Sequence, residues 1–112
     1  MMKPFLLAGL MVVVAVVTPL LLAAGGNADA GKAVYDKKCA LCHGKEGEGK
    51  ESIAKMMKVE LPHLGSKEVQ AKSDEDLKKI ITEGKGKMKP VAGLSDTDKN
   101  NVIAFVRSLA KK

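Results

Sequence analysis

The only two cysteines of the chain, Cys39 and Cys42, are separated by two residues, and His43 follows the second directly. Thiols and an imidazole at this spacing suit three kinds of chemistry. The cysteines could form a thiol–disulfide redox pair, they could bind zinc together with His43 and the second histidine, His63, or they could attach a haem covalently. Other features of the sequence are needed to distinguish these three kinds of chemistry.

The C-x-x-C-H spacing is the attachment signature of c-type haem, in which each thiol adds to a haem vinyl group and the histidine is held under the iron. On a helical turn, two residues between the cysteines put both sulfur atoms on one side. A redox pair would be expected within a strand–helix sandwich, and the chain has no such pattern. A zinc site would need the adjacent Cys42 and His43 to reach one tetrahedral ion, which adjacent residues rarely do. The motif therefore predicts covalent haem attachment.

The N-terminus has the pattern of an export segment. Lys3 precedes an uncharged run over residues 5–24, and the Ala-Asp-Ala of residues 28–30 then matches the small-x-small pattern of a signal-peptidase site. We therefore expect residues 1–30 to be a signal peptide and residues 31–112 to form the functional domain in the periplasm. An uncleaved membrane anchor is the alternative, because the apolar run is long enough to span a bilayer.

The charge and size of the predicted domain limit its partners and its core. The formal net charge is +6, and removing residues 1–30 takes away one basic and one acidic residue and leaves it unchanged. A basic domain can bind nucleic acid, anionic lipid or an acidic protein face, and export without base-stacking aromatics makes nucleic acid the least favoured. Tyr35 and Phe105 are the only aromatic residues after residue 30. A domain of about 80 residues with so few aromatics is expected to need a staple such as a metal, a disulfide or a cofactor.

Three segments have helical patterning, and none alternates like a strand. The first covers residues 31–41 and leads into the cysteine motif. The second is capped by Ser73 and ends at Gly84, and the third follows a cap at Ser95 and reaches the terminal lysines. After His43 lies a glycine-rich loop, and residues 52–61 can form at most a short helix before Pro62. The expected fold is all-α.

From "GKAVYDKKCALCHGKEGEG" through "LPHLGS" and "GKGKMKP" to "LSDTDKNNVIAFVRSLA", the predicted domain resembles the small bacterial class I c-type cytochromes. The resemblance implies three to five helices wrapped around one covalently bound haem c, with the N- and C-terminal helices crossed. It implies that Cys39 and Cys42 carry the thioether bonds. By the same resemblance, His43 is the proximal iron ligand and Met88 the distal one. Pro62 matches a proline whose carbonyl accepts a hydrogen bond from the proximal imidazole.

Chain spacing also supports Met88 as the distal ligand. Met88 follows His43 by 45 positions, which is enough chain to reach the opposite face of the haem, and glycines and a proline shape its loop. Met56 and Met57 follow His43 too closely and are expected in the core or in a lid. His63 is the alternative ligand, but its neighbour Pro62 would place it on the proximal side. A His/His iron would have a lower reduction potential than a His/Met iron.

Together these features predict a soluble monohaem electron carrier of the periplasm that shuttles single electrons between respiratory or photosynthetic partners and is not itself an enzyme. Two alternatives stay open. In one, the distal methionine is displaceable and the protein is a ligand sensor or a peroxidase-like enzyme. In the other, Cys39 and Cys42 form a thiol–disulfide pair without haem.

The lysines near the two ligand loops predict how such a carrier would dock. They are Lys45, Lys50, Lys85, Lys87 and Lys89. Grouped around the exit point of the electron, they suit transient, salt-sensitive binding to redox proteins with acidic faces. We expect a monomer that binds no nucleic acid and that contacts membranes only through partner complexes or a retained anchor.

Overall fold

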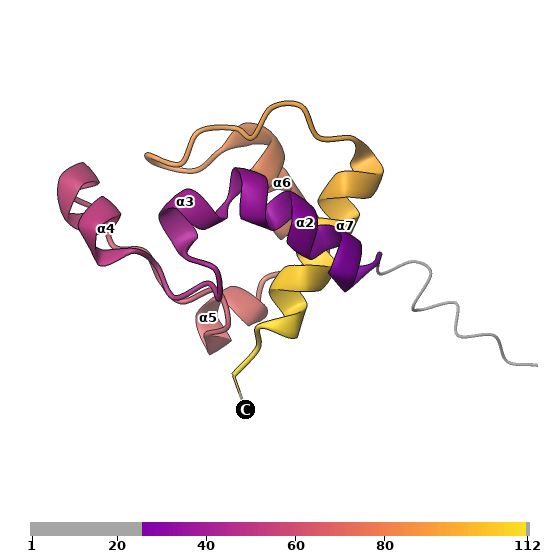
Figure 1. The fold of residues 1–112 in the computed structure, drawn as a ribbon, viewed down its shortest axis with the longest axis horizontal. Coiled ribbons are helices and arrows are strands. Elements are labelled where there is room, and N and C mark those ends of the chain that lie inside the picture. The colour runs from indigo at the N-terminus through magenta and orange to yellow at the C-terminus, as the bar shows by residue number, and fades with distance from the viewer. Residues whose placement is uncertain (1–25, 112) are drawn as a thin grey trace, which may run out of the picture.

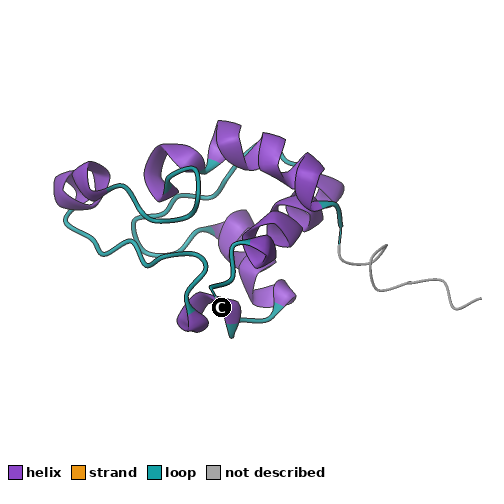
Figure 2. Cartoon of the chain, turned by 60° about the horizontal axis from the view of Figure 1, so that its bottom comes forward, coloured by secondary structure: helices purple, strands orange, loops and turns teal. Residues whose placement is uncertain are grey.

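The computed structural model describes residues 26–111, so the apolar run on which the export prediction depends lies outside the described residues. Within this range the helices are α2 (Ala28–Lys38), α3 (Ala40–His43), α4 (Glu51–Met57), α5 (Lys67–Gln70), α6 (Asp74–Glu83) and α7 (Asp96–Ser108). The described residues contain no strand, so the all-α prediction is confirmed (Figures 1 and 2). Over the same range, no helix is both long and apolar enough to cross a membrane.

Helices α2 and α7 cross and form the largest helix–helix interface of the fold (Figure 1). Gly31 lies at the crossing, where the backbone carbonyl of Asn101 occupies the space that a Cβ atom would need. One turn further along α2, Tyr35 is completely buried and packs on Phe105 of α7, with ring centroids 4.8 Å apart and tilted by 52°. The predicted crossing of the first and last helices is therefore confirmed.

Replacing Gly31 with alanine should destabilise the protein by about 3 kcal/mol, because a methyl group at the crossing would force the two helix backbones apart. Denaturant unfolding of the haem-containing protein measures this. Gly93→Ala is the matched control: its new Cβ would meet only the Lys38 ammonium, at 3.6 Å, and its cost should be the roughly 1 kcal/mol of a left-handed φ. Equal losses in the two variants would show that the α2–α7 crossing tolerates a wider separation.

Helix α2 begins three residues before the expected start of the domain. The side chain of Asn27 caps it by accepting a hydrogen bond from the Ala30 N–H at 3.0 Å. The backbone N–H of Asn27 also donates to the side-chain oxygen of Asn101 on α7, at 2.8 Å. Gly26 lies so close to the backbone of Asn100 that a Cβ would come within 2.6 Å of its carbonyl oxygen. Gly26 and Asn27 thus both contact α7 beside the helix crossing.

The predicted caps of the two later helices are both present. The Ser73 hydroxyl accepts a hydrogen bond from the Asp76 N–H at 3.0 Å at the start of α6. At the start of α7, Ser95 and Asp98 form a reciprocal capping box. The lysines expected in the last turn of α7 are not part of it, because the helix ends at Ser108, and Arg107 is the basic residue of that turn.

The apolar core consists of two buried clusters that meet at the cysteine motif. The larger cluster contains Val69, Leu77, Ile81, Val102, Ile103 and Val106. The smaller one contains Tyr35, Ala40 and Phe105. Cys39 packs against both clusters, so the first cysteine of the motif is fixed by the core itself.

Candidate functional site

The cysteine motif forms a single helical turn that follows an interruption of the helix. Helix α2 ends at Lys38, and the cap residue Cys39, with φ and ψ of −118° and −33°, separates it from α3. The N–H groups of Cys42 and His43 then both donate to the Cys39 carbonyl, at 3.2 and 3.0 Å. Both thiols are free and half-buried. The motif therefore lies on one tight turn, the geometry that its spacing predicts.

The electrostatics of Cys39 argue against a thiol–disulfide function. Burial, with a smaller contribution from Cys42, raises the pKa of the Cys39 thiol to about 11. Redox-active C-x-x-C pairs depend on a thiolate with a lowered pKa in an electropositive, partly exposed site. Cys39 is instead held protonated among apolar side chains, as suits a cysteine that anchors an apolar group.

His43 is the residue whose environment most needs explaining. Its Nδ1 atom is buried and has no hydrogen-bond partner among the residues that the structure describes. Burial also lowers the pKa of His43, so the imidazole is neutral, which is the form that ligates metals. A buried polar atom without a partner is costly, and native structures contain few of them. A buried, neutral imidazole can ligate a metal through one ring nitrogen while the other takes a hydrogen bond, and here Nδ1 lacks that hydrogen bond among the described residues.

The hydrogen bond expected from His43 to the carbonyl of Pro62 is not formed in the described part of the chain, since Nδ1 is unpaired. The side chain of Pro62 is exposed, in the segment that leads toward α5. The assignment of Pro62 as a support for the proximal ligand thus stays a prediction.

Met88 is half-buried and is presented by a short hairpin. Lys85 and Met88 exchange two backbone hydrogen bonds of 2.9 Å. Gly86, with a φ of 57°, occupies the first central position of the turn, as in a type II′ turn. The Val91 N–H donates to the carbonyl of Ile81 at 2.9 Å and ties the exit of the loop to α6. The sequence predicted a glycine-shaped loop here, and the structure shows that this loop is braced.

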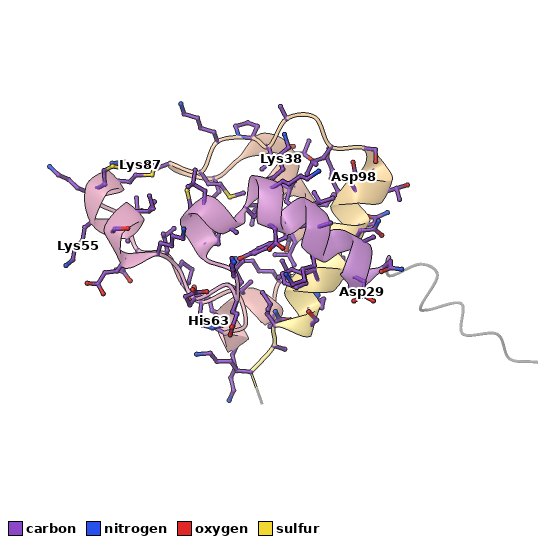
Figure 3. All side chains as sticks on the ribbon, in the orientation of Figure 1. Asp29, Lys38, Lys55, His63, Lys87 and Asp98 are labelled. Carbon is purple, nitrogen blue, oxygen red and sulfur yellow. The ribbon has the colours of Figure 1, made fainter. Side chains whose placement is uncertain are left out.

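His63, the rival ligand, is already engaged in local structure. Its Nδ1 accepts a hydrogen bond from the Gly65 N–H at 2.8 Å. In the view of Figure 3, His63 lies near the entry to α5, and Lys87, at the tip of the Met88 hairpin, lies on the other side of α3. Across residues 26–111, no three His, Cys, Asp or Glu side chains gather as a metal site would require. A zinc site built on the cysteine motif and His63 is therefore not formed there.

The loop after His43 is held more firmly than its glycine content indicated. The Gly49 N–H donates to the carbonyl of His43 at 2.6 Å, and the Lys50 N–H donates to that of Cys42 at 2.9 Å. The hydroxyl of Tyr35 donates to the carbonyl of Gly44 at 2.5 Å. In the sequence Tyr35 stands out only as one of two aromatic residues after residue 30, and no local signal could have shown this bond, because its acceptor is a backbone carbonyl nine residues away.

The five lysines near the two ligand loops are all exposed, but they are not equivalent. Lys87 donates to the backbone carbonyl of Met57 at 2.7 Å. The other four, Lys45, Lys50, Lys85 and Lys89, form no side-chain hydrogen bond or ion pair with any residue in the described range. Two large apolar side chains also lie exposed in this half of the molecule, Leu41 between the cysteines (70%) and Met56 on α4 (71%).

Comparisons with known proteins give one consistent result. The family model described as "Cytochrome C oxidase, cbb3-type, subunit III" matches residues 26–106. Cytochrome c-554(547) of Halothiobacillus neapolitanus is 34% identical over 90 residues, which cover 75% of this chain and 98% of the relative. Among solved structures, the KustC0563 c-type cytochrome has a similar fold, with a TM-score of 0.64 and 26% identity over 72% of this chain and 98% of that one.

Proposed function

The chain belongs to the cytochrome c family as a small class I c-type cytochrome, which binds haem c and its iron covalently, and on this premise we propose that it is a monohaem electron carrier of the periplasm. The observation that carries the proposal is the buried, neutral and unpaired imidazole of His43 on the same turn as two free thiols. When bound, the haem supplies an iron that cycles between the ferric and ferrous states.

The proposed roles of the site residues follow from their positions. Cys39 and Cys42 carry the two thioether bonds, and His43 is the proximal ligand. Met88 is the distal ligand, supported by its half-buried position on a braced hairpin and by the prior engagement of His63. If His43 and Met88 both held the iron, they would leave it no open site for a substrate, and the protein would act as a carrier and not as an enzyme.

Optical spectroscopy and carbon monoxide binding test this function. The purified protein should show a low-spin c-type spectrum, reversible one-electron reduction, and no carbon monoxide binding to the reduced form at neutral pH. Ready binding of carbon monoxide would favour the alternative in which Met88 leaves the iron and the protein acts as a sensor or a peroxidase-like enzyme. If a pyridine haemochrome assay detected no haem, the carrier and the sensor or peroxidase-like enzyme would both be excluded. The thiol–disulfide alternative would then remain.

We also propose that the chain is exported and that the haem domain begins at Gly26, so that cleavage falls ahead of this residue. Cleavage after Ala30 would remove Asn27, the cap of α2, with its hydrogen bond to Asn101. The Ala-Ala-Gly of residues 23–25 offers a second small-x-small pattern, and cleavage there would leave the capped helix whole. Intact-mass measurement of the exported protein decides this: a chain starting at Gly31, or one retaining residues 1–25, would contradict the proposal.

Electron exchange should be steered by the lysines around the haem-ligand loops. The +6 formal charge, reduced by about two units by the haem propionates, leaves the protein positive, so association with an acidic redox partner should slow as salt screens charges beyond roughly 8 Å. Lys45→Glu combined with Lys85→Glu should lower the second-order rate about tenfold at low ionic strength and leave the potential nearly unchanged.

The control for this experiment changes the same charge elsewhere. Lys67→Glu combined with Lys79→Glu alters exposed lysines of α5 and α6, outside both ligand loops. Lys87 is left intact because its ammonium is bonded to Met57. If both double variants slow the reaction equally, the rate follows net charge alone, and if neither does, docking uses apolar contact such as that offered by the exposed Leu41.

A further inference from the structure

Helix α4 is the least embedded helix of the described fold. None of its residues is buried, and Met56 is 71% exposed. Figure 1 shows α4 at the edge of the molecule, apart from the crossed α2 and α7. Among the described residues, two hydrogen bonds join residues 50–59 to other segments: the N-cap Lys50 N–H donates to the Cys42 carbonyl at 2.9 Å, and the Lys87 ammonium donates to the Met57 carbonyl at 2.7 Å. The first bond holds the start of α4, so the position of its C-terminal end depends on the bond from Lys87.

The chemistry of the contact favours its formation. Met57 is the last residue of α4, so its carbonyl belongs to the last turn, whose acceptors have no partner within the helix. The negative end of the helix dipole also lies there and attracts a cation. Lys58, in the left-handed conformation with φ of 56°, ends the helix at this point. An ammonium group that reaches Met57 donates a hydrogen bond to its carbonyl and also places a positive charge at the negative end of the α4 dipole.

The other end of the contact is the hairpin that carries Met88. Lys87 occupies the second central position of its turn, directly before Met88, and Figure 3 shows it reaching toward α4. The hairpin is closed by the paired hydrogen bonds between Lys85 and Met88, and its base is tied to α6 through Val91. Because the hairpin is braced, a movement that carries Met88 away also carries Lys87 away from Met57.

We propose that Lys87 is a positioning residue: by binding the C-terminal carbonyl of α4, it couples α4 to the Met88 hairpin and holds Met88 in place on the iron. This inference rests on the proposed function, in which Met88 is the distal ligand. It predicts that α4 and the hairpin open together. It also gives Lys87 a different role from Lys85 and Lys89, which belong to the same charged loop.

The test compares Lys87→Ala with Lys85→Ala in the haem-containing protein. The two variants remove the same charge from the same hairpin, but only the first removes the bond to Met57. The apparent affinity of the ferric protein for imidazole, which competes with Met88 for iron, should rise about two- to fivefold in Lys87→Ala, as expected for one cation at an exposed helix C-terminus. It should stay unchanged in Lys85→Ala, and Lys87→Arg should restore the original value.

Amide hydrogen exchange supplies a readout that does not involve the iron. The amides of α4 should exchange faster in Lys87→Ala than in Lys85→Ala, since α4 loses its one link to the hairpin. Equal imidazole affinities in the two alanine variants, or equal exchange of α4, would overturn the inference, because lost charge alone would then explain any effect.

The two possible failures are distinguishable. If Met88→Ala leaves the imidazole affinity of the ferric protein unchanged, Met88 is not the ligand, and the proposed ligation and the role of Lys87 fall together. If Met88→Ala raises that affinity strongly but Lys87→Ala does not raise it at all, the ligation stands and only the role of Lys87 is overturned.

Discussion

A variant in which Cys39 and Cys42 are both replaced by alanine, and which therefore cannot attach haem, should be largely unfolded at room temperature. The burial pattern is the reason. Between residues 41 and 68 only three residues are buried, and all three are glycines. The apolar side chains of this segment, among them Leu61 and Leu64, are only half-buried within the polypeptide. The haem should supply the apolar surface against which this third of the domain packs.

The part of the core that the chain builds alone is small. Among the described residues only Tyr35 and Val102 are almost completely buried large side chains. The nine buried apolar residues form a small core for a domain of about 80 residues, a size at which a further staple such as a cofactor is usually needed. Circular dichroism should therefore show a large loss of helix and no sharp thermal transition. A cooperative transition with native helicity would contradict the prediction.

The matched control for this experiment is the unsubstituted chain, produced without haem attachment. It keeps Cys39, which packs against both core clusters, so it separates the loss of haem from the loss of the sulfur atoms. Both haem-free proteins should be unfolded to a similar degree. If only the alanine variant unfolded, the cysteine side chains and not the haem would be responsible for the stability.

Features with a local cause could be predicted from the sequence. The caps at Ser73 and Ser95 were predictable because each serine bonds to an N–H only three residues away. The C-x-x-C-H turn was predictable because its geometry depends on three residues of known spacing. The start of α2 was not, because the predicted signal-peptidase pattern overlaps the Asn27 cap, whose partner Asn101 is 74 residues distant. Helix α5, which has only four residues, has too short a periodic pattern to be detected.

Contacts between distant segments account for what sequence reasoning could not find in the site. The glycine-rich loop after His43 carries no sequence signal for regular structure, yet its Gly49 N–H donates to the carbonyl of His43, and its Gly44 carbonyl accepts a hydrogen bond from the Tyr35 hydroxyl. Lys87 was grouped with its neighbouring lysines, because only the position of α4 distinguishes it. In both cases the partner is a backbone carbonyl, which every residue carries, so no residue type marks it in the sequence.

Replacing Met88 with alanine should change the spectrum and reduction potential of the iron more than any other substitution that leaves the protein folded. The ferric protein should lose its weak sulfur-to-iron charge-transfer band at the red end of the spectrum. The reduction potential should fall by on the order of 0.1 V, a modest part of the ~0.8 V range that axial ligands span. Carbon monoxide should then bind the reduced protein, and imidazole should bind the ferric protein, because Met88 no longer competes for the iron.

Two control variants make the Met88 assignment decisive. His63→Ala should leave the spectrum and the potential unchanged, because His63 already accepts the Gly65 N–H, and its loss should cost only about 1 kcal/mol of stability. Met56→Ala removes another thioether, one that is 71% exposed on α4, and should likewise leave the charge-transfer band intact. If His63→Ala abolished the low-spin spectrum while Met88→Ala preserved it, the iron would be ligated by two histidines. The reduction potential would then be that of a different kind of carrier, because an imidazole in place of a thioether stabilises the ferric state.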